Sequence, residues 1–268
     1  MKGILTIFNE MKQKVEFLAN RFPSLFKRET NKGRKLALSI VDIITLSLVK
    51  QKQGIETKKS LYEIAAPSCS YKTLVVNMNR FAIFALFFLK IILSWNVKNS
   101  HVIKHADSTD IPVCLNKNAK HHKTMEGLAG WRHSGKGMFY GIKLHLAADV
   151  ERRMLSFCFA PGNASDISQF MKVNKGLNGI FAADAGYTSE KLQKEFYREH
   201  KRILFAKPRK NMKKIITAFQ KRLYDTRMII ELNFRNLKMF YELVTSLPRS
   251  ISGYFANYLY AMLAYALK

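Results

Sequence analysis

Apolar residues recur at helical spacing through the first hundred residues. Between 35 and 49 they repeat every three or four positions, which predicts an amphipathic helix. A short helix is expected over 61–66, and another begins after Ser70 as its N-cap. The very apolar run 81–95 contains Lys90 and is shorter than the about 20 residues that span a membrane, so it favours a buried core helix. This part of the chain predicts a small helical bundle.

The pattern changes near residue 100, where short apolar runs and strict alternation replace helical spacing. A strand is expected over 101–106, and a hairpin is expected from 138–148 and 154–160. Two further short runs, 179–183 and 202–207, have the length and composition of buried strands. Five strands are therefore predicted after residue 100.

Helices are expected between and after these strands. One follows Asn163 or Ser165 as its cap and another follows Ser189, while a long helix is predicted over 219–241 and a last one over 254–267. The polar, glycine-bearing stretch 116–137 is expected to be a loop. The order predicts a mixed α/β fold, with a five-stranded mixed sheet and flanking helices, preceded by a basic helical region.

Charge narrows the possible partners. The net charge is +26, and ten of the 19 acidic residues lie between 101 and 200, which leaves both ends strongly basic. An excess of this size points to a polyanionic partner, with nucleic acid ahead of an anionic membrane surface. Three widely spaced cysteines show no C-x-x-C pair and fit a reducing cytoplasm, and no signal peptide is recognisable at Met1.

Two aspartates follow predicted strands directly. Asp107 comes after the strand at 101–106, and Asp184 comes after the strand at 179–183. Carboxylates at the ends of adjacent strands can share Mg²⁺, which prefers hard oxygen ligands, and a metal pair can cleave a phosphodiester. The alternative is that each aspartate is only a turn residue.

A third acid lies in the predicted long helix. Glu231 interrupts an apolar run, and a buried acid needs a partner. At about 100° per residue, Tyr224, Arg227, Glu231 and Lys238 fall within an arc of about 60°, and Arg235 lies beside them. One face therefore offers an acid for a metal ion, a phenol, and cations for phosphate oxygens.

These residues carry a resemblance to a known family. The spacing Tyr224-x2-Arg227-x3-Glu231-x6-Lys238 resembles the Tyr-Arg-Glu-Lys motif of bacterial insertion-sequence DDE transposases. Asp107-Ser-Thr-Asp and Ala-Asp184-Ala-Gly-Tyr look like the two aspartate motifs of the same group. The resemblance covers 101–268 and implies an RNase H-like catalytic domain that cuts and joins DNA.

The resemblance also implies roles for the residues. Asp107, Asp184 and Glu231 would be the catalytic carboxylates and the ligands of two Mg²⁺ ions, with Mn²⁺ as a substitute. Tyr224, Arg227 and Lys238 would hold phosphates at the cleaved end. Relatives with this motif insert a β-rich domain before the glutamate that assists hairpin formation on DNA, and the short interval here leaves the cleavage route open.

A basic tract precedes the motif. Between 198 and 222 a single acid, Glu199, accompanies ten basic residues. Neutralisation of DNA phosphates is the favoured interpretation, and a merely solubilising surface is the alternative. With the helix stripe, the predicted DNA-binding set is Tyr224, Arg227, Arg235, Lys238, Lys207, Arg209, Lys210, Lys213 and Lys214.

The sequence therefore predicts a two-part DNA transposase. Residues 1–100 would recognise DNA ends or dimerise, and 101–268 would cleave element ends and transfer strands into target DNA. We expect double-stranded DNA as partner, a homodimer when DNA is bound, no membrane and no nucleotide cofactor, in the bacterial cytoplasm at the nucleoid. A metal-dependent nuclease without strand transfer and a decayed, non-catalytic DNA-binding protein remain alternatives.

Overall fold

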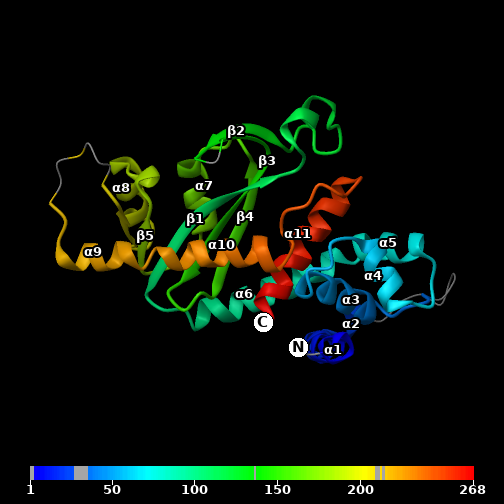
Figure 1. The fold of residues 1–268 in the computed structure, drawn as a ribbon. Helices are drawn as coiled ribbons and strands as arrows, with labels where there is room; N and C mark the ends of the chain where they lie inside the picture. Colours follow the sequence, from blue (N-terminus) through cyan, green and yellow to red (C-terminus); the bar gives the residue numbers. More distant parts are fainter. Residues whose placement is uncertain (1–2, 27–35, 136, 209–211, 213–214) are drawn as a thin grey trace. The chain divides into compact units, whose positions relative to one another are not determined.

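The computed structural model describes the chain apart from residues 1–2, 27–35, 136, 209–211 and 213–214 (Figure 1). The described residues form two compact units. One comprises Met1–Ile91 with Asn236–Lys268, and the other comprises Ile92–Arg235. This division differs from the predicted boundary at residue 100, because the C-terminal helix packs with the N-terminal helices.

A six-stranded mixed sheet is the framework of the Ile92–Arg235 unit. Its strands are β1 (Ile103–Pro112), β2 (Gly130–Ser134), β3 (Gly137–Asp149), β4 (Met154–Pro161), β5 (Ile180–Ala183) and β6 (Ile203–Ala206). Strand β1 is antiparallel to β3 and parallel to β5, and β5 is parallel to β6. Strands β2 and β4 both pair with β3, on the edge away from β1. The predicted mixed α/β, RNase H-like sheet is confirmed.

The number of strands is a correction. Strand β2 forms within the stretch 116–137 that was predicted to be a loop, and the same stretch also holds the 3₁₀-helix η1 (Asn116–His121). In β2, Trp131 pairs with Tyr140 of β3, and their rings lie 5.5 Å apart. Aromatic cross-strand packing stabilises such a short strand. The basic and polar residues around it make the alternation of apolar and polar side chains hard to recognise in the sequence.

A glycine fixes the closest approach between β1 and β3. A Cβ on Gly141 would lie 2.2 Å from the carbonyl oxygen of Ile111, which is closer than any real contact. The pairing of Gly141 with Pro112 therefore requires glycine. A shift of the β1–β3 pairing by one residue would turn every side chain of β1 to the opposite face of the sheet. The close contact at Gly141 therefore also helps to fix the register.

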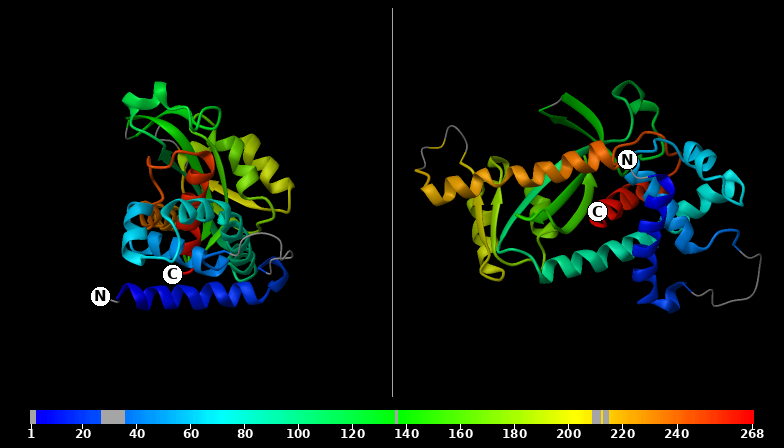
Figure 2. Two further views of the ribbon diagram at one scale, coloured as in Figure 1. Left: turned by 90° about the vertical axis from the view of Figure 1, so that its right-hand side faces the viewer. Right: turned by 60° about the horizontal axis from the view of Figure 1, so that its bottom comes forward.

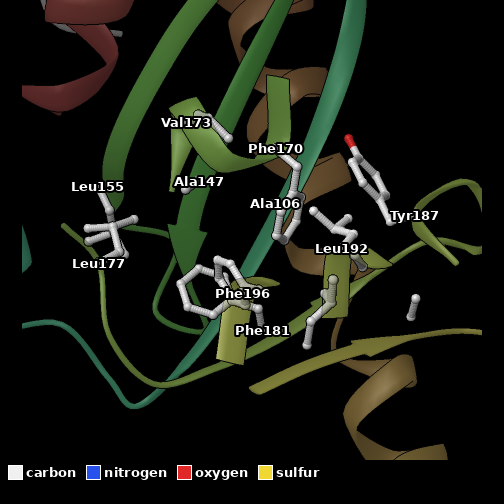
Figure 3. Packing of buried hydrophobic residues seen from close by; sticks show 13 residues of the cluster. Ala106, Ala147, Leu155, Phe170, Val173, Leu177, Phe181, Tyr187, Leu192 and Phe196 are labelled. Carbon is white, nitrogen blue, oxygen red and sulfur yellow. The ribbon is translucent and has the colours of Figure 1, made fainter. Parts of the chain in front are cut away.

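One hydrophobic cluster packs helices α7 (Asp166–Val173) and α8 (Glu190–Arg198) on the sheet (Figure 3). Its centre is aromatic: the Phe196 ring meets Phe181 at 4.9 Å and Phe170 at 5.1 Å between centroids, in edge-on geometry. Ser189 caps α8 as predicted, by accepting a hydrogen bond from the Leu192 amide. The cluster fixes the strands and helices that carry the acidic residues described below.

The predicted long helix over 219–241 is two helices, α9 (Ala218–Asp225) and α10 (Met228–Phe240). Between them the Thr226 hydroxyl donates to the Leu223 carbonyl, and the amide of Arg227 bonds three residues back, to Tyr224. These tighter bonds replace the regular i to i−4 ladder and interrupt the helix. The two helices nevertheless keep nearly one direction (Figure 1 and Figure 2).

The other unit is helical, as predicted for the N-terminal region. It contains α1 (Ile4–Asn20), α2 (Pro23–Phe26), α3 (Ile40–Lys52), α4 (Lys58–Ala65), α5 (Tyr71–Arg80), the start of α6 (Ala82–Lys98), and α11 (Ile251–Ala266). Its core includes Ile43, Leu61, Leu74 and Met78. Buried hydrogen bonds join α11 to the N-terminal helices: Gln51 donates to Asn257, and the Tyr260 hydroxyl donates to the Met78 carbonyl.

The stretch Tyr71–Lys98 is long and apolar enough, by length and composition, to cross a membrane, and 39% of its most apolar window is buried. Within α6, Ala85, Leu89 and Ile92 are buried, whereas Lys90 and Ser94 are exposed. The apolar Ile83, seven residues before Lys90, is also exposed, so α6 shows little separation of polar and apolar sides. Its assignment as a core helix stays a prediction.

Candidate active site

One aspartate lies on a strand and another directly follows the neighbouring parallel strand. Asp184 follows β5 directly, as predicted, but Asp107 lies in the middle of β1 rather than past its end. The strand continues because β3 pairs with it as far as Pro112, although polar residues follow Asp107. The last pair between β1 and β5 is His105 with Ala182, two residues before each aspartate. Asp107 and Asp184 therefore have corresponding positions on adjacent strands.

Arg227 connects Asp107 to the third predicted acid. Its guanidinium Nη1 lies 3.3 Å from Oδ2 of Asp107, and Nη2 lies 2.8 Å from Oε1 of Glu231. Arg227 lies at the junction between α9 and α10, and Glu231 lies in the first turn of α10. The helix break therefore places Arg227 where it contacts both the sheet and Glu231.

The environment of Asp107 disfavours its charged form. Its pKa is raised to about 7, mainly by burial and to a smaller degree by the nearby carboxylates of Asp184 and Asp166. The backbone amide of Ser108, 2.8 Å from Oδ1, and the charge of Arg227 act in the opposite direction. A carboxyl group of this kind gains from a cation, because a positive charge stabilises its ionised form.

A buried polar network lies next to Asp107. The Asp166 carboxylate accepts hydrogen bonds from Ser108 Oγ at 2.8 Å and from Lys143 Nζ at 2.9 Å. Lys143 is only 3% exposed, and its ammonium also donates to the Ala164 carbonyl at 3.2 Å. The pKa of Asp166 is lowered: burial would raise it, but the bonds from Lys143 and Ser108 outweigh that effect.

The sequence pattern did not predict this network. Asp166 begins α7, where an acid is ordinary, and Lys143 lies in an alternating strand among apolar residues. Lys143 alone could have indicated it, because a lysine within a buried, apolar strand needs an anionic partner.

The predicted phosphate-binding residues have different positions. The Tyr224 hydroxyl donates to the carbonyl of Ala206 at the end of β6, at 3.0 Å. Lys207 is exposed and follows β6, and its backbone amide donates to Ala183, next to Asp184. Arg235 is exposed on α10. The structure thus brings Tyr224 and Lys207 to the strand ends near Asp184.

The remaining members of the predicted set are less closely defined. Lys238 is half-buried in α10, seven residues after Glu231 on the same helix. Arg209, Lys210, Lys213 and Lys214 lie outside the described residues.

The donor chemistry fits a hard divalent cation. Carboxylate oxygens are what Mg²⁺ prefers, and a divalent cation would favour the ionised form of Asp107, whose pKa burial raises. Among the residues that the structure describes, however, no three His, Cys, Asp or Glu side chains lie close enough to hold a metal ion. Here the Arg227 guanidinium lies between Asp107 and Glu231. The three-carboxylate ligand set therefore stays a prediction.

Comparison with known proteins gives the family. A family described as "Transposase DDE domain" matches residues 98–251. A cryo-EM structure of a piggyBac transposase synaptic complex with hairpin DNA is similar in fold, with a TM-score of 0.51 and 11% identity, over 99% of this chain and 73% of that chain. No curated protein sequence matches the chain. The family match covers more than half of the chain, including Asp107, Asp184 and Glu231, and the chain therefore belongs to the DDE transposase domain family.

Proposed function

We propose that this protein is the DNA transposase of a bacterial insertion sequence, which cleaves the ends of its element and joins them to target DNA. The observation that carries the proposal is the arrangement of Arg227 between Asp107 and Glu231, with Asp184 directly after β5, the strand that pairs with β1. The fold neighbour was solved with DNA, which supports DNA as the partner. The net charge of +26 supports the same partner.

The acidic residues would hold the metal. Asp107, Asp184 and Glu231 would bind Mg²⁺, or Mn²⁺ in its place. When bound, the metal would activate the attacking oxygen and neutralise charge on the phosphate. A nearby cation would favour the ionised form of the Asp107 carboxyl group. The parallel pairing of β1 and β5 holds Asp107 beside Asp184.

The basic and phenolic residues would position the DNA. Arg227 offers a planar fork of donors that suits phosphate oxygens as well as carboxylates. Lys207 and Arg235 are exposed, so their charges are available to the backbone of a duplex. Tyr224 is anchored to the end of β6, which directs its ring from α9 to the strand ends. We expect a homodimer on DNA, acting at the nucleoid in the cytoplasm.

The test is cleavage and joining of DNA that carries candidate element ends. Purified protein is incubated with Mg²⁺ and labelled duplex, and nicked and joined products are separated on a gel. Asp107→Asn and Asp184→Asn should lose both products while still binding DNA. Asp225→Asn is the matched control, since this exposed acid lies on α9 beside Tyr224, and it should cleave normally.

The outcomes separate the candidate functions. Nicked DNA without joined product would favour a metal-dependent nuclease. DNA binding without any cleavage in the unmodified protein would favour a decayed, non-catalytic DNA-binding protein. Full activity in both aspartate variants would overturn the assignment of the site.

A further inference from the structure

A cavity of about 330 Å³ lies within the unit formed by Met1–Ile91 and Asn236–Lys268. It opens among the start of α4, one side of α5, and the segment that leads into α11. Its lining includes three cationic side chains, Lys50, Lys58 and Arg249, and one acidic side chain, Glu56. The proposed DNA chemistry uses none of these residues.

Lys50 is the unusual member of this lining. It lies in α3, is only 4% exposed and lines the cavity, yet its side-chain ammonium makes no hydrogen bond or ion pair with any residue that the structure describes; the bond from the Ile55 amide goes to its backbone carbonyl. The carboxylates of Glu242 and Glu56 act on its charge only at longer range, without a direct contact. An ammonium group removed from water without a direct partner is costly, because a buried charge needs compensation. The cavity beside it has room for that partner.

Further donors converge on the same cavity. Lys58, in the first turn of α4, donates to Oδ1 of Asn79 at 2.6 Å, which leaves other ammonium hydrogens available. Burial lowers the pKa of both Lys50 and Lys58 to about 8, as expected for ammonium groups without a neutralising anion. Arg249 contributes an exposed guanidinium at the rim.

The N-terminus of α11 also borders the cavity. Ser250 caps this 16-residue helix by accepting a hydrogen bond from the Gly253 amide at 3.1 Å, and both residues line the cavity. One cap satisfies one of the amides that a helix leaves unpaired at its start, and the helix dipole favours an anion there. A buried, unpaired ammonium and a helix N-terminus thus face the same space.

We propose that this cavity binds a phosphate group. Phosphate carries enough negative charge for two ammonium groups, and its oxygens accept several hydrogen bonds at once from ammonium, guanidinium and amide donors. The phosphate is either free or part of a DNA backbone. The DNA source rests on the proposed function, whereas the site itself does not.

The first experiment titrates the full-length protein with inorganic phosphate by calorimetry. Lys50→Met keeps the length of the side chain and removes the charge. Lys59→Met removes a neighbouring charge whose side chain is 74% exposed, so it is the matched control. We expect phosphate binding in the unmodified protein and in Lys59→Met, and binding at least tenfold weaker in Lys50→Met. Equal binding in Lys50→Met, or no binding of phosphate or DNA by the unmodified protein, would overturn the proposal.

Folding of each variant is checked by circular dichroism. If Lys50→Met does not fold, Lys58→Met replaces it, with the same expected loss, because Lys58 lines the same cavity and is less buried than Lys50. Normal phosphate binding in a folded Lys58→Met variant would then overturn the proposal.

The second experiment identifies the source of the phosphate. Affinity for a DNA duplex is measured against salt concentration, since each phosphate contact contributes about −0.9 to the logarithmic slope. If the cavity holds a backbone phosphate, Lys50→Met should flatten the slope by about that amount relative to Lys59→Met. An unchanged slope together with lost inorganic-phosphate binding would assign the site to free phosphate. If the protein binds inorganic phosphate but does not cleave DNA, the transposase proposal fails and the phosphate site does not.

Discussion

At the scale of single residues, Asp107 is the group whose chemistry depends most on its surroundings. Its raised pKa is mainly an effect of burial, and Arg227 partly offsets it. The folded protein therefore binds a proton at Asp107 up to about pH 7, whereas the unfolded chain releases it near the ordinary value of 3.8.

This difference predicts a pH-dependent cost of folding. As pH rises from about 4 to 7, the unfolded chain is deprotonated and the folded chain is not, so Asp107 progressively destabilises the fold and does so fully above pH 7. In metal-free buffer, Asp107→Asn should be more stable than the unmodified protein at pH 8, by about 1–2 kcal/mol, and this advantage should shrink by pH 5. Urea unfolding at both pH values measures it. A stability difference that does not change with pH would contradict the raised pKa.

Arg227 gives a second prediction at this scale. Arg227→Ala removes a cation from Asp107 and Glu231 and, under the proposed function, a contact with phosphate. We expect strand joining to fall more than first-strand nicking, by about 1–3 kcal/mol in transition-state stabilisation, because a cut end must stay positioned for a second attack. Time courses of nicked and joined DNA measure the two steps. Equal losses would assign Arg227 to cleavage alone.

At the scale of elements, the network of Ser108, Lys143 and Asp166 joins β1, β3 and α7 at Asp107. Asp166→Ala leaves the buried Lys143 ammonium without its carboxylate, and it should destabilise the fold by about 2–4 kcal/mol. Ser165→Ala is the control, because the Ser165 side chain makes no capping hydrogen bond, and it should be nearly neutral. Thermal unfolding compares the two. A small effect of Asp166→Ala would show that water replaces the carboxylate.

The sequence pattern predicted elements well where periodicity and caps agree. Ser70 and Ser189 cap the helices expected after them, and the hairpin of β3 and β4 lies where alternation indicated it. The pattern failed where tertiary contacts decide: β1 continues past Asp107 because β3 pairs with it. The helix break at Thr226 arises from a side-chain hydrogen bond that the periodicity does not register.

The sequence pattern selected the candidate residues, whose roles stay a prediction, and it predicted little of the geometry between them. The spacing of Tyr224, Arg227 and Glu231 indicated a shared face, and Arg227 and Glu231 do lie together. The contact of Arg227 with Asp107 joins positions 120 residues apart in the chain. No local sequence pattern relates residues so far apart, and the contact depends on the packing of α9 against the sheet that carries Asp107.

At the scale of the whole molecule, the excess of positive charge should dominate affinity for DNA. Affinity should fall steeply with salt, at roughly −0.9 per phosphate contacted on logarithmic axes. Reversal of charge at Lys210, Lys213 and Lys214 should flatten this slope by about 0.9 for each phosphate that these side chains neutralise in the unmodified protein. Reversal at Lys172, Lys175 and Lys191, which are exposed on or near α7 and α8, is the control with the same change in net charge. If the salt slope flattens equally in both triple variants, the positive charge attracts DNA generally and these three lysines do not form a specific contact with it.

The pairing of β1 with β5 has a consequence for the life of the protein in the cell. Asp107 and Asp184 come together only after both strands exist, and Glu231 follows later still along the chain. At ordinary rates of synthesis, roughly ten seconds separate the appearance of the first acid from that of the last. During this interval the basic N-terminal helices have already left the ribosome. Under the proposed function, a product truncated before Glu231 keeps the basic N-terminal residues but lacks one of the three carboxylates, so premature termination would yield a molecule that cannot cut DNA.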